Sequence, residues 1–210
     1  EVYLVRRHRG ASFMASAYVF PGGVAEPGDA GPRETAAREL AEECGVRVAP
    51  GDLHYFAHWI TPSVERRRYS ARFFVAALPP GQTPAFDNRE TVDEVWVTPA
   101  EALARAGELR LPPPQIRSLL EIAPAAARGL PALLALCAER AAAPHPILPR
   151  ACPAPGGFTL LLPWDPDYEG LGQGDALAIP PDHPLATGPS RFVLEGTTWV
   201  HTEAPGTRAG

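Results

Sequence analysis

Four charged side chains within a short stretch are the best suited to chemistry: Arg38, Glu39, Glu42 and Glu43. On an α-helix that turns about 100° per residue, they fall within an arc of about 140° and share one face. Like charges at this spacing repel one another, and one arginine cannot neutralise three carboxylates. Because hard divalent cations prefer oxygen ligands, the pattern predicts a Mg²⁺ site at Glu39, Glu42 and Glu43, with Mn²⁺ as a substitute.

A merely solvated acidic helix face is the alternative interpretation of this cluster, but its surroundings argue against it. Gly22 and Gly23 precede the cluster, a loop containing Glu26 and Asp29 follows them, and Gly45 comes two residues after the last glutamate. Glycine permits the backbone conformations that tight turns and helix C-termini require. A strand, a loop, a helix and a second loop are therefore predicted in succession, and a solvated helix would need no such frame.

Hydrophobic periodicity and the positions of Gly and Pro predict the elements that hold this cluster. The glutamates belong to a helix over residues 35–44, whose opposite face of small residues is expected to pack on a sheet while the carboxylates point outward. Strands are predicted at residues 2–5, 17–20, 53–60, 71–78 and 92–97, the third and fourth forming a hairpin through residues 63–68. Further helices are predicted at residues 98–105, 115–122 and 130–142.

Beyond residue 143 the composition shifts to proline, glycine and short apolar runs at residues 158–162 and 190–200. We expect a small β-rich extension there. Capping a pocket, forming the surface of a homodimer and covering a sheet edge are all compatible with such an extension.

Charge and composition exclude several classes of protein. The net charge of −5 and the pI near 5.7 argue against a dedicated nucleic-acid binder and are compatible with a small anionic substrate. All 19 basic residues are arginine, so Schiff-base chemistry and a Walker-type phosphate loop, which need lysine, are excluded. The three cysteines lack paired spacing, which favours a reducing cytoplasm over a disulfide framework or a zinc site. We expect no membrane span and no signal peptide.

The sequence FPGG at residues 20–23, with RELAEECGV at residues 38–46, resembles the Nudix box, whose core reads REUXEEXGU, where U is a bulky apolar residue. The core matches at every defined position. The resemblance implies an α+β fold, an α/β/α sandwich with a mixed sheet, in residues 1–125. Residues 126–210 would then be a helical and β-rich extension packed on this core. One departure is that Asp29 stands where the family has a glutamate, and the loop before Arg38 is one residue longer.

Nudix resemblance implies Mg²⁺-dependent attack of water on a phosphorus atom of a nucleotide-derived diphosphate. Outside the box, residues 13–23, 59–62, 66–79 and 94–115 resemble the branch of the peroxisomal coenzyme A diphosphatase and its bacterial relatives. Coenzyme A or acyl-coenzyme A is therefore the expected substrate. A diphosphatase for NADH, ADP-ribose or another nucleoside diphosphate derivative is the first alternative. The second is a non-catalytic nucleotide sensor, which the three retained box glutamates disfavour.

The catalytic residues expected from the resemblance are Arg38, Glu42, Glu43 and Glu90. Either Glu43 or Glu90, in the loop DNRET, is the general base, and the sequence leaves this choice open. Candidate substrate-binding residues are Gly22 and Gly23, together with Arg66, Arg67 and Arg68, since arginine binds phosphate in a bidentate manner.

Several other side chains receive no firm function from the sequence. Four aromatic residues are placed to stack on a base, although aromatic residues in strands more often belong to the core: Phe13, Tyr18, Tyr55 and Trp59. His8, His54 and His58 are assigned no ligand function. Cys44 is expected to be a small buried hydrophobic residue and not a nucleophile.

Overall fold

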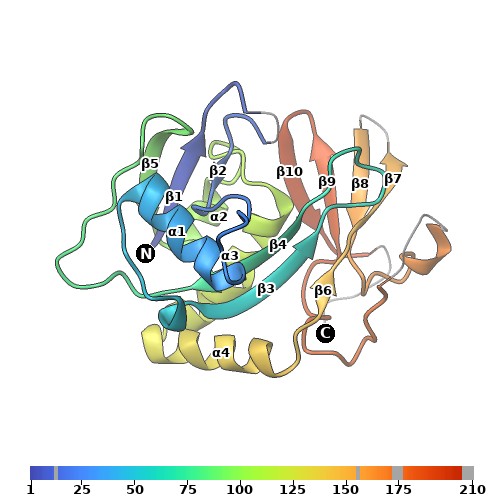
Figure 1. Cartoon of the computed structure of the whole chain (residues 1–210). Coiled ribbons are helices and arrows are strands. Elements are labelled where there is room, and N and C mark those ends of the chain that lie inside the picture. The colour runs from blue at the N-terminus through green and yellow to red at the C-terminus, as the bar shows by residue number, and fades with distance from the viewer. Residues whose placement is uncertain (12–13, 155–156, 172–176, 205–210) are drawn as a thin grey trace. The chain divides into compact units, whose positions relative to one another are not determined.

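The computed structural model describes residues 1–11, 14–154, 157–171 and 177–204. Figure 1 shows its elements in chain order. The strands are β1 (Val2–Arg7), β2 (Tyr18–Val19), β3 (His54–Ile60), β4 (Ser70–Val75), β5 (Thr91–Val97), β6 (Pro146–Ile147), β7 (Arg150–Ala154), β8 (Gly157–Leu161), β9 (Arg191–Glu195) and β10 (Thr198–Thr202). The α-helices are α1 (Pro32–Cys44), α2 (Pro99–Ala104), α3 (Pro113–Ala126) and α4 (Leu130–Ala142), with 3₁₀ turns η1 (Pro50–Asp52) and η2 (Glu169–Leu171).

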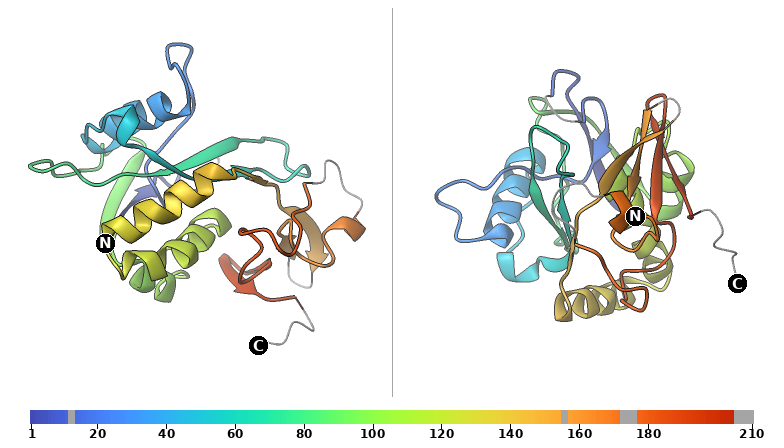
Figure 2. Two further views of the ribbon diagram at one scale, coloured as in Figure 1. Left: turned by 90° about the horizontal axis from the view of Figure 1, so that it is seen from below. Right: turned by 90° about the vertical axis from the view of Figure 1, so that its right-hand side faces the viewer.

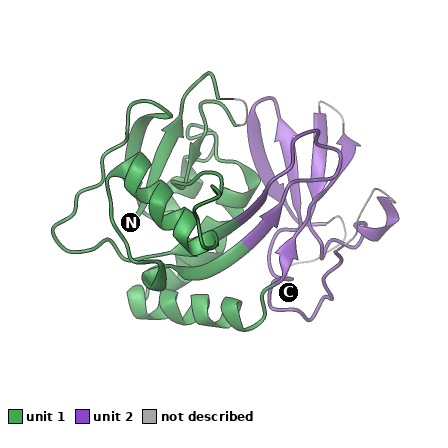
Figure 3. Cartoon of the chain, viewed as in Figure 1, with its two compact units in different colours: residues 1–57, 72–144 green, residues 58–71, 145–210 purple. Residues whose placement is uncertain are grey.

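The chain divides into two compact units, coloured green and purple in Figure 3. Unit 1 consists of residues 1–57 and 72–144, and unit 2 of residues 58–71 and 145–210. Helix α4 thus belongs to the same unit as α1. The expected division into domains at residue 125 stays a prediction.

The sheet that supports the acidic helix in unit 1 has the strand order β2-β1-β5, with β1 antiparallel to both neighbours. Side chains alternate across a strand, so Tyr3, Val5 and Arg7 of β1 point to one face. Val5, with its partner Val19 on β2, packs in the buried cluster that also contains Cys44 at the end of α1. Helix α1 therefore covers this face of the sheet.

The opposite face of the same sheet carries Leu4 and Val97, both buried. Helix α2 contacts β5, and α2 packs on α3. Figure 2 shows α2 and α3 on the other side of β1 and β5 from α1. A capping box at Thr98 and Glu101 fixes the start of α2. The sheet therefore lies between α1 on one face and α2 and α3 on the other.

The second sheet has the order β4-β3-β6, and β3 pairs with β6 in parallel. Strands β3 and β4 are neighbours, as the predicted hairpin requires. In unit 2, β7 to β10 form an antiparallel sheet of order β10-β9-β8-β7. Its connecting segments are tied by Asp165, a fully buried carboxylate that accepts hydrogen bonds from Ser190 and Arg191. The predicted β-rich extension is confirmed.

Two expectations are refined by the structure. The strands of the described residues divide into three sheets, whereas a mixed sheet was expected in the N-terminal region. Helix α1 begins at Pro32, earlier than predicted, since a proline at the first position of a helix needs no hydrogen-bonded N–H. In the part of the chain that the structure describes, every helix is too short or too polar to cross a membrane.

Candidate active site

Helix α1 ends where the sequence predicts, at a glycine. Gly45 adopts the left-handed conformation, with φ of 69°, and its N–H donates to the carbonyl of Ala41. The apolar side of the helix, including Ala36 and Leu40, packs against the core of unit 1. This orientation turns the glutamates toward the loop that follows β2.

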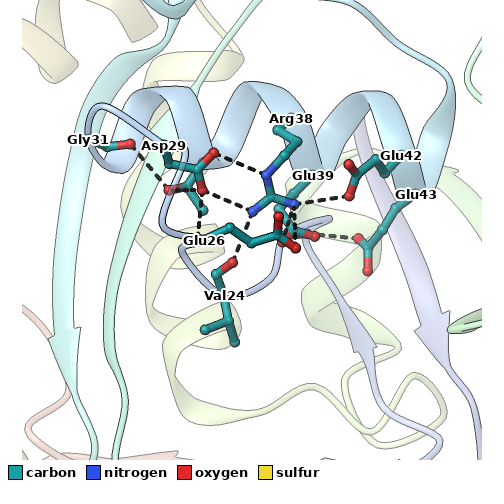
Figure 4. Close-up of polar contacts among 10 residues, drawn as sticks. Val24, Glu26, Asp29, Gly31, Arg38, Glu39, Glu42 and Glu43 are labelled. Atoms are coloured by element: carbon teal, nitrogen blue, oxygen red, sulfur yellow. Dashed lines mark hydrogen bonds and ion pairs between the residues drawn. The ribbon is translucent and has the colours of Figure 1, made fainter.

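Arg38 connects the helix to that loop, as Figure 4 shows. Its Nε and Nη2 atoms donate to the two carboxylate oxygens of Asp29 at 3.1 and 3.0 Å, and Nη2 also donates to the carbonyl of Val24 at 3.0 Å. Such bidentate pairs fix geometry as well as charge. The guanidinium holds the pKa of Asp29 well below its usual range, and the pKa of Arg38 is raised in return.

Asp29, to which the sequence alone assigns no function, lies at the centre of this loop network. Besides Arg38, it accepts hydrogen bonds from the Thr35 hydroxyl and from the backbone N–H of Glu26, both at 2.9 Å. Thr35 is buried on the first turns of α1. Although the loop is one residue longer than in the family pattern and Asp29 is shorter than a glutamate, these hydrogen bonds still fasten the loop to the helix.

Glu39 and Glu42 share the third guanidinium nitrogen of Arg38, since Nη1 lies 3.0 Å from a carboxylate oxygen of each. Their environments differ, because the side chain of Glu39 is 13% exposed and that of Glu42 is 60% exposed. Burial raises the pKa of Glu39 against the opposing effect of Arg38, and the charges of Glu42 and Glu90 raise it further. The charged form of Glu39 is thus disfavoured chiefly by burial and further by its acidic neighbours.

Glu43 is buried, which corrects the expectation that all three carboxylates point outward. It lies at the last turn of α1, where the helix meets the loop after β2, and its Oε2 accepts a hydrogen bond from the N–H of Gly22 at 2.9 Å. Burial raises its pKa to about 7; the Gly22 bond and the charge of Arg7 oppose the shift, and the charges of Glu39 and Glu90 add to it. A carboxyl group with this pKa is about half ionised near neutral pH.

The glycine pair is shaped around these carboxylates. A Cβ atom at Gly23 would overlap the carboxylate of Glu39, so no larger residue fits without moving that side chain. Gly22 has φ of +153°, a conformation that favours glycine, and it is the donor to Glu43. Both glycines therefore contact the acidic cluster, while their predicted contact with substrate stays a prediction.

Glu90 joins the cluster from the loop before β5. It is exposed, and its charge contributes to the raised pKa of both Glu39 and Glu43. Its carbonyl accepts a hydrogen bond from the N–H of His8 at 2.9 Å, at the end of β1. The structure thus brings the fourth predicted acid into electrostatic range of two of the box glutamates.

Arg7 is a residue of this site that the sequence analysis missed. It lies on the face of β1 that α1 covers, and its charge lowers the pKa of Glu43. Within the described residues, its buried Nε atom has no hydrogen-bond partner. The predicted strand stopped at Val5; extending the alternation of that strand by two residues would have found Arg7 on the same face as Val5.

The three arginines predicted to bind phosphate lie in unit 2, on the exposed segment between β3 and β4. Arg68 donates from Nε to the carbonyl of Thr61 at 3.1 Å, and Arg67 lies over the ring of Tyr69, 5.5 Å from its centroid. Arg68 thus helps to close the turn. Phosphate binding by Arg66, Arg67 and Arg68 stays a prediction.

The aromatic candidates have structural partners. The Tyr18 hydroxyl donates to Asp93 at 2.8 Å, Tyr55 packs edge-on against Phe74, and Trp59 is buried. Phe13 lies outside the described residues.

The other polar candidates also have local functions. His58 shares a hydrogen bond with Ser70, and Nδ1 of His8 accepts one from Gly10. Cys44 is fully buried, as predicted, and burial raises its thiol pKa to about 12.

The carboxylates of this cluster are ligands of the kind that a divalent cation prefers. Burial raises the pKa values of Glu39 and Glu43, and neighbouring acids, among them Glu39 for Glu43, add to the shift, a condition that a bound cation would relieve. In this structure the carboxylates of Glu39 and Glu42 pair with Arg38. Among the described residues, no three His, Cys, Asp or Glu side chains are placed together to hold a metal ion. Glu39 and Glu42 would have to turn from Arg38 toward the ion.

Comparisons with known proteins identify the family to which this chain is similar. The family model described as "NUDIX domain" matches residues 1–118. The "Putative nudix hydrolase 7" of Caenorhabditis elegans is 27% identical over 165 residues, covering 58% of this chain and 55% of that protein. The "Acyl-coenzyme A diphosphatase NUDT19" of Xenopus laevis is 33% identical over 73 residues, covering 32% of this chain and 19% of that protein. The chain thus spans about half or less of these relatives.

Among solved structures, a Nudix hydrolase from Alicyclobacillus acidocaldarius superposes with a TM-score of 0.50 at 23% identity, covering 57% of this chain and 81% of that one. This likeness concerns the fold alone.

Proposed function

Because the chain belongs to the Nudix family, we propose that it hydrolyses the diphosphate bond of a nucleotide-derived substrate with the help of a divalent cation. The observation that carries this proposal is the pair Glu39 and Glu43, two carboxylates with raised pKa values that both contact the glycine loop and lie within electrostatic range of each other. Such perturbed acids are typical of functional sites. The proposal applies to unit 1, where all of these residues lie.

Glu39, Glu42 and Glu43 are the residues that would hold Mg²⁺ or Mn²⁺. A bound ion supplies positive charge that neutralises phosphate oxygens as the bond to phosphorus breaks. The surrounding residues keep the acids in place: Gly22 donates to Glu43, and Arg38 fastens the loop through Asp29. Arg38 is therefore a positioning residue in this proposal.

Glu90 is the better candidate for the general base. Glu43 already accepts the Gly22 hydrogen bond and is assigned to the ion, whereas the carboxylate of Glu90 is exposed and within electrostatic range of both glutamates. As the oxygen of water attacks phosphorus and the bridging P–O bond breaks, Glu90 takes the proton of that water. The leaving phosphate carries away the electron pair of the broken bond.

Arg7 is proposed to bind a phosphate of the substrate. The alternation of β1 puts Arg7 on the α1 face of the sheet, its charge acts on Glu43, and its Nε lacks a hydrogen-bond partner within the described residues. A phosphate oxygen would make a charge-assisted hydrogen bond with this guanidinium.

Coenzyme A or acyl-coenzyme A is the substrate class that we favour. One relative is named an acyl-coenzyme A diphosphatase, over a match of 73 residues. The resemblance of residues 66–79 and 94–115 to the same branch supports this choice. NADH and ADP-ribose are the alternative substrates.

The experiment that tests the proposal is an activity screen of the purified chain with coenzyme A, acyl-coenzyme A, NADH and ADP-ribose, each with Mg²⁺ and with Mn²⁺. Mass spectrometry of the products should detect phosphopantetheine and adenosine 3′,5′-bisphosphate from coenzyme A. Hydrolysis of NADH or ADP-ribose alone would replace the coenzyme A assignment. Binding of these nucleotides without turnover would instead identify a sensor and refute the enzymatic proposal.

A further inference from the structure

Asp87 stands at the start of the loop that carries Glu90, and its carboxylate organises the backbone of that loop. Oδ1 accepts hydrogen bonds from the N–H of Arg89 at 3.1 Å, and from the N–H and the hydroxyl of Thr91 at 3.0 and 2.8 Å. Oδ2 accepts from the N–H of Glu90 at 3.2 Å. One side chain thus satisfies three consecutive backbone donors, as an aspartate at the start of a tight turn can.

The same loop is fastened at two further points. The carbonyl of Glu90 accepts from His8 at the end of β1, and Thr91 is buried in register with Arg7. The backbone of Glu90 is therefore bonded on both sides, through its N–H to Asp87 and through its carbonyl to β1, while its side chain is exposed. A fixed backbone beneath an exposed carboxylate is an arrangement that presents a side chain in a defined position.

We propose that Asp87 is a positioning residue that holds Glu90 where it acts as the general base. This inference rests on the proposed function of Glu90. Asp87 itself does not take the proton, because both of its oxygens already accept hydrogen bonds from the loop.

The ionisation state of Asp87 is consistent with this arrangement. Partial burial acts to raise its pKa, but the N–H groups of Thr91, Arg89 and Glu90 and the Thr91 hydroxyl outweigh it and hold the pKa at about 2. The acceptor is therefore charged throughout the neutral pH range, where a charged acceptor makes the stronger hydrogen bonds.

The test is a double-mutant cycle between Asp87 and Glu90, measured with the substrate found in the screen. Asp87→Ala should lower kcat about tenfold with little change in KM, because the loop stays folded but no longer holds the base in place. Asp87→Asn should lose less, since the amide oxygen can replace Oδ1. In a Glu90→Gln background, Asp87→Ala should cause no further loss. Asp52→Ala removes an exposed aspartate elsewhere in unit 1 and is the control, with unchanged kinetics.

The outcomes separate this inference from the function on which it rests. Equal losses from Asp87→Ala with and without Glu90 would show that Asp87 merely stabilises the fold and would overturn the proposal. Full activity of Glu90→Gln would refute both Glu90 as the base and Asp87 as its positioning residue. Amide hydrogen exchange provides a readout that needs no activity: Asp87→Ala should speed exchange at Glu90 and Thr91, and unchanged protection there would also overturn the proposal.

Discussion

The N–H of Gly22 donates to Oε2 of Glu43 at 2.9 Å, so the loop after β2 is bonded directly to the last turn of α1. This hydrogen bond joins the two halves of the box sequence across 21 residues. The carboxylate is thereby oriented before any ion or substrate arrives.

Glu43→Gln and Glu42→Gln should each lower metal-dependent hydrolysis by about two or more powers of ten, because a neutral amide is a poor ligand for a hard cation. Initial rates at saturating Mg²⁺ measure the effect. Glu139→Gln is the matched control, since Glu139 is an exposed glutamate on a helix of the same unit. Turnover that stays at the level of the control would remove these glutamates from the site.

The stability of the metal-free protein should fall as pH rises between about 4.5 and about 7. Burial raises the pKa of Glu43 from 4.5 to about 7, so across this window the folded state binds more protons than the unfolded state. Ionising the buried carboxylate then costs free energy that the unfolded chain does not pay. Glu43→Gln removes this cost, because glutamine does not ionise and its oxygen can still accept from Gly22.

Thermal melts in a chelator at pH 5 and pH 8 test this expectation. The variant should melt above the wild type at pH 8 and close to it at pH 5. If the variant melted at a lower temperature than the wild type at pH 8, the folded protein would stabilise the charged form of Glu43, which contradicts the pKa rise expected from burial.

Asp29→Asn should destabilise the protein at neutral pH and lose this effect in acid. The pKa of Asp29 is lowered, chiefly by its hydrogen bonds to Arg38, so the stability that it contributes is present above its ordinary pKa and disappears as pH falls through the lowered value. The difference between the melting temperatures of the two proteins should be constant above about pH 4 and should narrow as pH falls from about 4 to about 2. A constant difference at all pH values would show that the charge of Asp29 is irrelevant to the loop.

The sequence predicted the helix, its glycine end and the identity of the acids, because these depend on local periodicity and residue type. Helix α4 was predicted at the bounds that the structure shows. The burial of Glu43 was not predictable from helix geometry, because the residue that covers it, Gly22, lies in another segment. The interactions of Asp29 and Asp87 are likewise made by loops, whose backbone donors carry no signature in the sequence. Periodicity therefore identifies which side chains share a face, and only the fold shows what covers that face.

Arg7→Gln should raise KM for a diphosphate substrate about tenfold while the protein stays folded, because the variant loses a charge-assisted hydrogen bond to phosphate. Arg9→Gln, at an exposed position two residues along, is the matched control and should leave KM unchanged. Steady-state kinetics with the substrate found in the screen measure both. An unchanged KM for Arg7→Gln, or an equal rise for Arg9→Gln, would contradict phosphate binding by Arg7.

Gly23→Ala should weaken metal binding more than it weakens folding. The added methyl group would overlap the carboxylate of Glu39, and that side chain is the part best able to move away. Displacing one of the proposed ligands should lower Mn²⁺ affinity about tenfold or more, a quantity that calorimetry or the electron paramagnetic resonance of free Mn²⁺ measures.

Gly28→Ala is the control within the same loop, because a Cβ atom there meets nothing within 4 Å. If both variants bound Mn²⁺ as tightly as the wild type, the close approach of Gly23 to Glu39 would have no part in metal binding. If both variants lost affinity equally, the loss would come from a general stiffening of the loop and not from the contact between residue 23 and Glu39. A loss confined to Gly23→Ala would tie metal affinity to the position of the Glu39 carboxylate.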